Sequence, residues 1–115
     1  MFKLVMERSV EWLVTINVPK DGGAVDKRKV HVTYKLPPTA KVEELQRNDD
    51  GTPEKDWLLE VTTNWRDEDF QAEDGQPMPF SKENLMKVLA ITYARAAFHV
   101  AFMEAAAGIE ARRKN

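Results

Sequence analysis

Apolar residues recur at every second position in two stretches of the N-terminal third of the chain. The first stretch contains Val10, Trp12, Val14, Ile16 and Val18, and the second contains Val30, Val32, Tyr34 and Leu36. A period of two is typical of strands with one buried face. Between the stretches, Asp21, Gly22 and Gly23 tolerate the positive φ of a turn. We therefore expect an antiparallel hairpin.

A third, shorter strand is expected ahead of this hairpin, because Phe2, Leu4 and Met6 also occupy every second position. The sheet is expected to end at Pro37 and Pro38, since proline lacks the N–H that a strand ladder needs and biases the residue before it away from helix.

Helical patterns follow the two prolines. A short helix is expected over residues 42–47, and a second is expected to be capped by Thr52, with Pro53 at its first position. The second helix would present one apolar stripe made of Trp57, Leu58, Val61 and Trp65. The acidic segment from Arg66 to Phe80, which contains two prolines, is predicted to be a loop.

The C-terminal part is predicted to be helical from Ser81 onwards, with Ser81 as the N-cap. One unbroken helix over residues 82–113 would be about 48 Å long, longer than a domain of this size is wide. We therefore expect a break near Ile91 to Tyr93 and a long alanine-rich helix after it. Basic residues suit the far end of that helix, namely Arg112, Arg113 and Lys114.

These patterns predict one α+β domain over residues 1–115, in which an antiparallel hairpin or three-stranded sheet (1–36) precedes three or four helices (37–115). The expected core consists of Trp12, Val14, Ile16, Val32, Tyr34, Trp57, Val61, Trp65, Phe80, Leu85 and Leu89.

Charge and hydropathy exclude several classes of partner. The formal net charge is −2, but residues 49–75 carry ten acidic and two basic side chains, while each flank has a net charge of only +3. We therefore expect no nucleic-acid partner. No apolar run approaches the ~20 residues that cross a bilayer, and residues 1–8 do not resemble a secretory signal. A cytoplasmic protein without a membrane partner is expected.

Candidate catalytic chemistry is sparse. The chain has no cysteine, which excludes disulfides, thiolate zinc sites and thiol nucleophiles. His31 and His99 stand on different predicted elements without a second ligand at metal-binding spacing. The acidic run from Asp67 to Asp74 lacks the ligand pattern of a calcium loop. We expect a non-enzymatic protein with no catalytic residue, no metal and no cofactor.

The last predicted helix is apolar over more of its circumference than one buried stripe needs. Part of its surface is therefore expected to bind a partner, and self-association through this helix is the competing explanation. The candidate contact residues are Phe98, Phe102, Met103 and Ile109.

The segment from Glu73 to Leu85 resembles a motif of the tail assembly chaperones of long-tailed, lambda-like phages, written EDG-x-P-x-PFS-x-E-x-L. In that family a tryptophan and an acidic loop precede the motif, as Trp65 and residues 67–74 do here. A leading β-hairpin and a C-terminal helix are also usual. The alanine-rich last helix and the strongly acidic loop depart from the family pattern, so the motif does not locate the partner surface.

The resemblance implies a non-catalytic protein of the host cytoplasm that is absent from the mature virion. Its partner would be the tape measure protein, which it keeps soluble before the tail tube polymerises, with the major tail protein as a second candidate. Two alternatives remain open at this point. One is another phage or prophage structural or neck protein, and the other is a small hydrolase that uses the carboxylates of residues 67–74.

Overall fold

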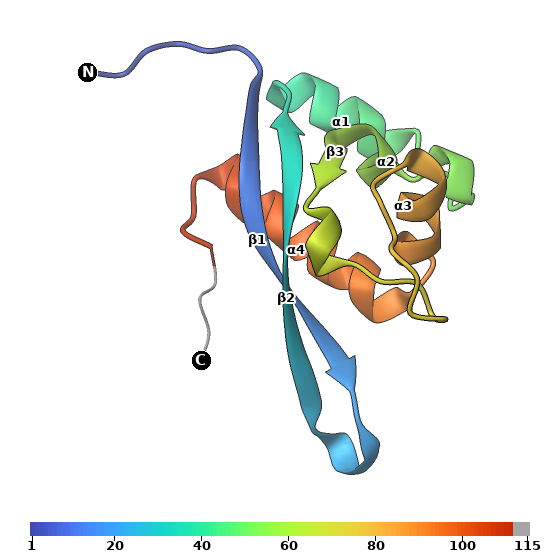
Figure 1. Ribbon diagram of the computed structural model, residues 1–115. Coiled ribbons are helices and arrows are strands. Elements are labelled where there is room, and N and C mark those ends of the chain that lie inside the picture. Colours follow the sequence, from blue (N-terminus) through green and yellow to red (C-terminus); the bar gives the residue numbers. More distant parts are fainter. Residues whose placement is uncertain (112–115) are drawn as a thin grey trace.

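A long antiparallel hairpin dominates the computed structural model, which describes residues 1–111. Strands β1 (Arg8–Pro19) and β2 (Val25–Leu36) pair along their whole length, with Val14 opposite Val30. The turn between them is closed by a hydrogen bond from Lys20 N to Ala24 O of 2.9 Å. Gly22 has a φ of +87°, a conformation that glycine adopts without strain. The predicted hairpin is confirmed, and its tip extends beyond the helices in Figure 1.

The third strand comes from later in the chain than the sequence pattern predicted. Strand β3 (Thr62–Trp65) pairs with β2, so that the strand order is β1-β2-β3. The prediction that Phe2, Leu4 and Met6 form a strand is wrong, because the residues before Arg8 precede the sheet as an exposed arm. No turn sequence brings this arm back onto β1, and β3 occupies the second edge of β2.

The middle of the chain is less helical than its apolar spacing predicted. Helix α1 (Thr39–Arg47) lies where a short helix was expected, but the next segment forms a 3₁₀ turn (Pro53–Lys55) and a five-residue helix α2 (Trp57–Val61). Thr52 precedes the 3₁₀ turn, with Pro53 at its first position as expected, but its side chain makes no cap hydrogen bond. The expected helix through Trp65 is wrong, because α2 ends at Val61. Asp56 caps α2 instead and accepts from Leu58 N at 3.0 Å. The β-branched run that begins at Val61 favours extended backbone, which starts β3.

The acidic segment forms a loop with one 3₁₀ turn (Asp67–Asp69), as predicted, and leads into α3 (Lys82–Leu89). The loop is fastened to Trp65, whose ring stacks on Phe70 at a centroid distance of 3.9 Å and meets the edge of Phe80 at 5.2 Å. The Trp65 indole N–H also donates to the Met78 carbonyl at 3.1 Å. Ser81 caps α3 as predicted and accepts from the backbone N–H of the third helical residue at 3.0 Å.

Helix α4 (Thr92–Ala107) follows α3 after a bend of 108°, so the predicted break near Ile91 is confirmed. Gly108, with a φ of +72°, ends the helix. The basic residues expected at its far end, Arg112, Arg113 and Lys114, lie outside the described residues. In residues 1–111, no single helix has the length and hydropathy to cross a membrane, and only the bent α3–α4 pair meets both criteria together.

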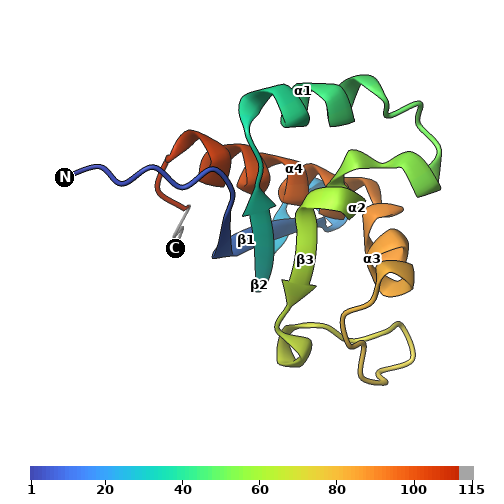
Figure 2. The ribbon, with the colours of Figure 1, turned by 90° about the horizontal axis from the view of Figure 1, so that it is seen from above.

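The core lies between α4 and one face of the sheet, which the helix crosses (Figures 1 and 2). Phe98, Phe102 and Tyr34 are fully buried, and the Tyr34 ring meets the edge of the Phe102 ring at 5.5 Å. The Tyr34 hydroxyl donates to the Phe98 carbonyl at 2.9 Å. Burial raises the pKa of the Tyr34 phenol, and the charge of Glu104 raises it further, so the phenol stays a proton donor.

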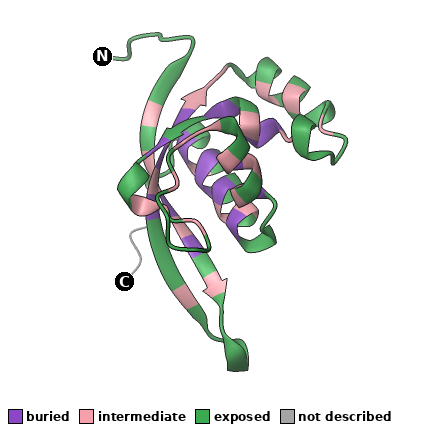
Figure 3. Cartoon of the chain, turned by 45° about the vertical axis from the view of Figure 1, so that its right-hand side comes forward, coloured by how far each residue is buried: buried purple, intermediate pink, exposed green. Residues whose placement is uncertain are grey.

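Burial is concentrated in the centre of the sheet and on the helices that face it, while the hairpin tip and the N-terminal arm are exposed (Figure 3). Every predicted core residue belongs to this cluster, with Trp12 and Phe80 at its half-buried rim. The prediction missed much of the α4 contribution, which comprises Ala94, Phe98, Ala101 and Phe102.

Replacing Phe102 tests the packing of α4 on the sheet. We expect Phe102→Ala to lower the free energy of unfolding by about 3–5 kcal/mol, because it leaves a cavity beside Tyr34 and Trp57. Met103→Ala, at the exposed neighbouring position, is the control and should change it by less than about 1 kcal/mol. Urea denaturation measures both. Equal losses in the two variants would contradict this orientation of α4.

Candidate functional site

The four predicted partner-contact residues divide between the two faces of α4 and the segment after it. Phe98 and Phe102 are 0% exposed, so the expectation that they lie on the surface is wrong. They are four residues apart and thus share one helix face, which the sheet and Trp57 cover. Met103 is 42% exposed and Ile109 is 57% exposed, so both are accessible, and partner binding there stays a prediction.

The outer face of α4 carries a second apolar stripe. Its members alternate at spacings of three and four residues, and all five are exposed: Tyr93, Ala96, Val100, Met103 and Ala107. We call this stripe the α4 seam. Spacings of three and four in alternation are the heptad pattern with which one helix packs against another. The heptad spacing was readable in the sequence, but periodicity alone could not tell which of two apolar faces the sheet would cover.

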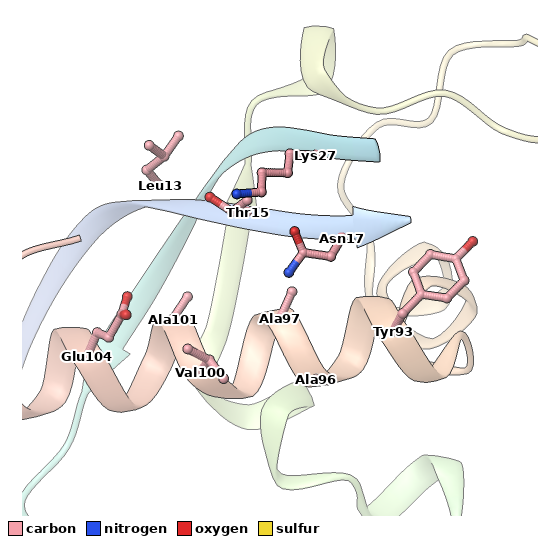
Figure 4. Close-up of a pocket in the computed structure, with 10 residues that line it drawn as sticks. All are labelled: Leu13, Thr15, Asn17, Lys27, Tyr93, Ala96, Ala97, Val100, Ala101 and Glu104. Atoms are coloured by element: carbon pink, nitrogen blue, oxygen red, sulfur yellow. The ribbon is translucent and has the colours of Figure 1, made fainter. Parts of the chain in front are cut away.

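A groove runs between α4 and strand β1 and adjoins the α4 seam (Figure 4). Its volume is about 280 Å³. The helix wall is lined mainly by small residues, including Ala96, Ala97 and Ala101, and the strand wall by Leu13, Thr15 and Asn17. Glu104 lies toward the Leu13 end and Tyr93 toward the other end, and Lys27, which pairs with Asn17 across the hairpin, extends toward Thr15 in the middle. We call this cavity the β1–α4 groove.

The acidic loop uses its carboxylates to bind its own backbone and that of β2. Asp69 accepts from the backbone N–H of His31 at 2.8 Å and contacts the His31 ring Nδ1 at 2.9 Å. Asp67 accepts from Phe80 N at 3.1 Å, and Asp74 accepts from Gln76 N at 3.0 Å. The three cavities described for residues 1–111 are lined by other segments. The geometry therefore gives these three carboxylates structural roles in the loop.

A second polar cluster joins α4 to the start of α2. The Arg95 guanidinium donates two hydrogen bonds of 2.9 Å to the Asp56 carboxylate and one of 3.3 Å to Asp49. Asp56 is also the N-cap of α2. With both carboxylates bound to one guanidinium, this cluster acts as a clamp. In the part of the chain that the structure describes, no three potential His, Asp or Glu ligands gather where they could hold a metal ion.

Lys82 fastens the first turn of α3 to the end of α2. Its ammonium donates to the carbonyls of Leu59 and Thr62. Burial lowers the pKa of Lys82, and the nearby charge of Glu60 opposes that shift. Since carbonyl oxygens already accept hydrogen bonds from this ammonium, Lys82 has a positioning role in the fold.

Comparisons with models of known protein families, with curated proteins and with solved structures found no match to this chain. The α4 seam and the β1–α4 groove are therefore candidate binding surfaces on structural grounds alone. The α4 seam is exposed and apolar, and the β1–α4 groove is a cavity beside it.

Replacing Arg95 tests whether the polar cluster is a structural clamp. We expect Arg95→Ala to lower the free energy of unfolding by about 1–3 kcal/mol, because two partly buried carboxylates lose their partner. Arg95→Lys keeps the charge without the two-pronged geometry and should lose about half as much. Thermal and urea denaturation measure the change. Unchanged stability in Arg95→Ala would show that the cluster does not hold α4 in place.

Proposed function

We propose that this protein is a non-enzymatic binding protein that covers an apolar helix of a larger partner and keeps that partner soluble. The α4 seam is the observation that carries the proposal, because it is an exposed heptad stripe on the outer face of a helix whose opposite face is already buried. From Tyr93 to Ala107 the seam is about 21 Å long, which matches roughly four turns of a partner helix.

The composition of the seam suits a partner with a variable apolar sequence. Ala96 and Ala107 let another helix backbone approach closely, while Met103 is flexible and adapts to differently shaped neighbours. Val100 and Tyr93 supply larger contact areas. A chaperone that shields a long chain needs such tolerance, because successive segments of its partner present different side chains.

The resemblance of residues 73–85 to the tail assembly chaperone motif gives this function a biological setting. We propose the tape measure protein as the partner, with the major tail protein as the second candidate, and the host cytoplasm as the place of action. In the fold, the motif residues Phe80 and Ser81 join Trp65 to the start of α3. The motif thereby supports the orientation of α3 and of α4 after it, which favours a scaffolding role for these residues.

Co-expression with a tape measure protein tests the proposal. We expect Val100→Asp to weaken binding more than tenfold, because it places a carboxylate in an apolar helix interface at a cost of about 2–4 kcal/mol. The soluble fraction of the tape measure protein should fall accordingly. Val25→Asp, at an exposed apolar position near the hairpin tip, is the matched control and should leave solubility unchanged. The seam has no role in binding if the Val100→Asp variant has a native circular dichroism spectrum and keeps the tape measure protein as soluble as the natural chain does.

Mass spectrometry of purified particles tests the assembly role separately. A chaperone that acts before the tail tube polymerises should be missing from particles that contain the major tail protein. Stoichiometric recovery of the chain in those particles would support the alternative of a structural or neck protein instead.

A further inference from the structure

The N-terminal arm, residues 1–7, has the alternation of a strand but does not pair within the chain. Phe2 is 85% exposed, Leu4 is 70% exposed and Met6 is 64% exposed. All three are in phase with the buried residues of β1, such as Val14, so an extended arm continues β1 with its apolar side chains on the same face. The arm leads away from the body of the molecule (Figures 1 and 2).

Strand β2 does not extend to pair with the arm, because proline follows its last paired residue. Arg8 pairs with Leu36, and the same antiparallel register would place Glu7 opposite Pro37. Proline has no N–H to donate to a strand ladder. Helix α1 then begins at Thr39, which ends any extension of β2. A strand that pairs with the arm must therefore come from outside the chain's own hairpin.

We propose that the arms of two copies of this chain pair with each other as antiparallel strands centred on Val5. A symmetric pair of this kind has a two-fold axis perpendicular to the ribbon, which keeps each face of one arm beside the same face of the other. Even-numbered residues therefore oppose even-numbered residues, and odd-numbered residues oppose odd-numbered ones. Centring on Val5 places Lys3 opposite Glu7 of the second copy, and symmetry forms this pair twice.

Charge selects this register over the neighbouring ones. A pair centred on Leu4 or on Met6 places a charged residue opposite Val5. A pair centred on Lys3 or on Glu7 places like charges directly opposite each other. Opposite charges across an antiparallel pair stabilise it, and like charges destabilise it. The register centred on Val5 is therefore favoured, because it sets Lys3 opposite Glu7 at both ends.

The apolar residues of the arm fit the same register. Leu4 lies opposite Met6 of the second copy, and Phe2 lies opposite Arg8, whose guanidinium packs on the aromatic ring. These cross-strand contacts cover part of each side chain that is exposed in the single copy. The ion pairs lie on the other, odd-numbered face. Self-association through the arm does not rest on the function proposed above.

Disulfide trapping in the full-length protein tests the register, because the natural chain has no cysteine. Val5→Cys places two cysteines directly opposite each other, with Cα atoms about 4.5–5.5 Å apart, a separation that a disulfide spans. Two copies of Leu4→Cys, or of Met6→Cys, lie diagonally at about 7–8 Å, which is beyond that range. Under mild oxidation we expect Val5→Cys to form a linked dimer at least tenfold faster than either control.

Side-chain exposure alone predicts the opposite order, since Val5 is 43% exposed and the two control positions are more exposed. A mixture of Leu4→Cys and Met6→Cys should give heterodimer well above the one-half share that random collision yields, because these positions face each other across the pair. Equal rates for the three single variants would overturn the proposal, and so would a random distribution of products in the mixture.

Charge reversal on the cysteine-free protein gives an independent measurement by sedimentation equilibrium. The natural chain should dimerise with rising concentration. Lys3→Glu should raise the dimer dissociation constant about fivefold at low salt, because it sets carboxylates opposite each other at both ends. Lys20→Glu, exposed beside the hairpin turn, makes the same change of net charge and is the matched control, which should dimerise like the natural chain.

The double variant Lys3→Glu/Glu7→Lys restores opposite charges and should recover the dissociation constant of the natural chain. Both positions are exposed, so the variants keep their fold, which circular dichroism verifies. A natural chain that stays monomeric at every concentration would contradict the proposal, as would a double variant that dimerises no better than Lys3→Glu. Either negative result leaves the co-expression test intact, because the arm is not part of the α4 seam.

Discussion

The packing of one face of α4 on the sheet is the contact on which the rest of the structure depends. Phe98 and Phe102 fill the space above Tyr34, and the Tyr34 hydroxyl satisfies the Phe98 carbonyl. Small residues beside them, Ala101 and Ala105, let the helix lie close to the strands. Because these residues fix the rotation of α4, they also determine that the α4 seam faces outward.

Two sets of contacts hold the start of α4 in position. Phe70 of the acidic loop and Phe80 pack against the Trp65 ring, and these contacts position Ser81, the N-cap of α3. The Arg95 clamp then ties the first turn of α4 to Asp56 at the start of α2. The sharp bend between α3 and α4 is thus supported from both sides, and the 16-residue helix α4 keeps one orientation on the domain.

Sequence patterns predicted the elements whose signals are local. The alternation around Val14 and Val32, the cap at Ser81 and the break near Ile91 all depend on neighbouring residues, and all three are confirmed. The third strand could not be predicted in this way, because Thr62–Trp65 forms a strand only by pairing with β2. Helical spacing of Trp57, Val61 and Trp65 suggested one helix, yet tertiary pairing took Trp65 into the sheet.

The candidate surface was predicted only in part, for a related reason. Helix α4 is apolar on two faces, and periodicity cannot decide which face a sheet covers. Aromatic Phe98 and Phe102 were expected to bind a partner, but their large side chains fill the core, while the smaller Ala96 and Val100 remain outside. The β1–α4 groove is lined by residues that are about 80 positions apart in the chain, so a local sequence pattern cannot predict it.

Tyr93, Ala96 and Val100 belong both to the α4 seam and to the β1–α4 groove, so a helix that packs on the seam would also contact the groove. Methyl NMR of the chain, titrated with an amphipathic helical segment of a tape measure protein, tests whether the α4 seam binds a partner helix. We expect the methyl shifts of Ala96, Val100, Met103 and Ala107 to change together and saturate, while core alanines such as Ala94 change little. Saturable binding that leaves the seam methyls unmoved would contradict it.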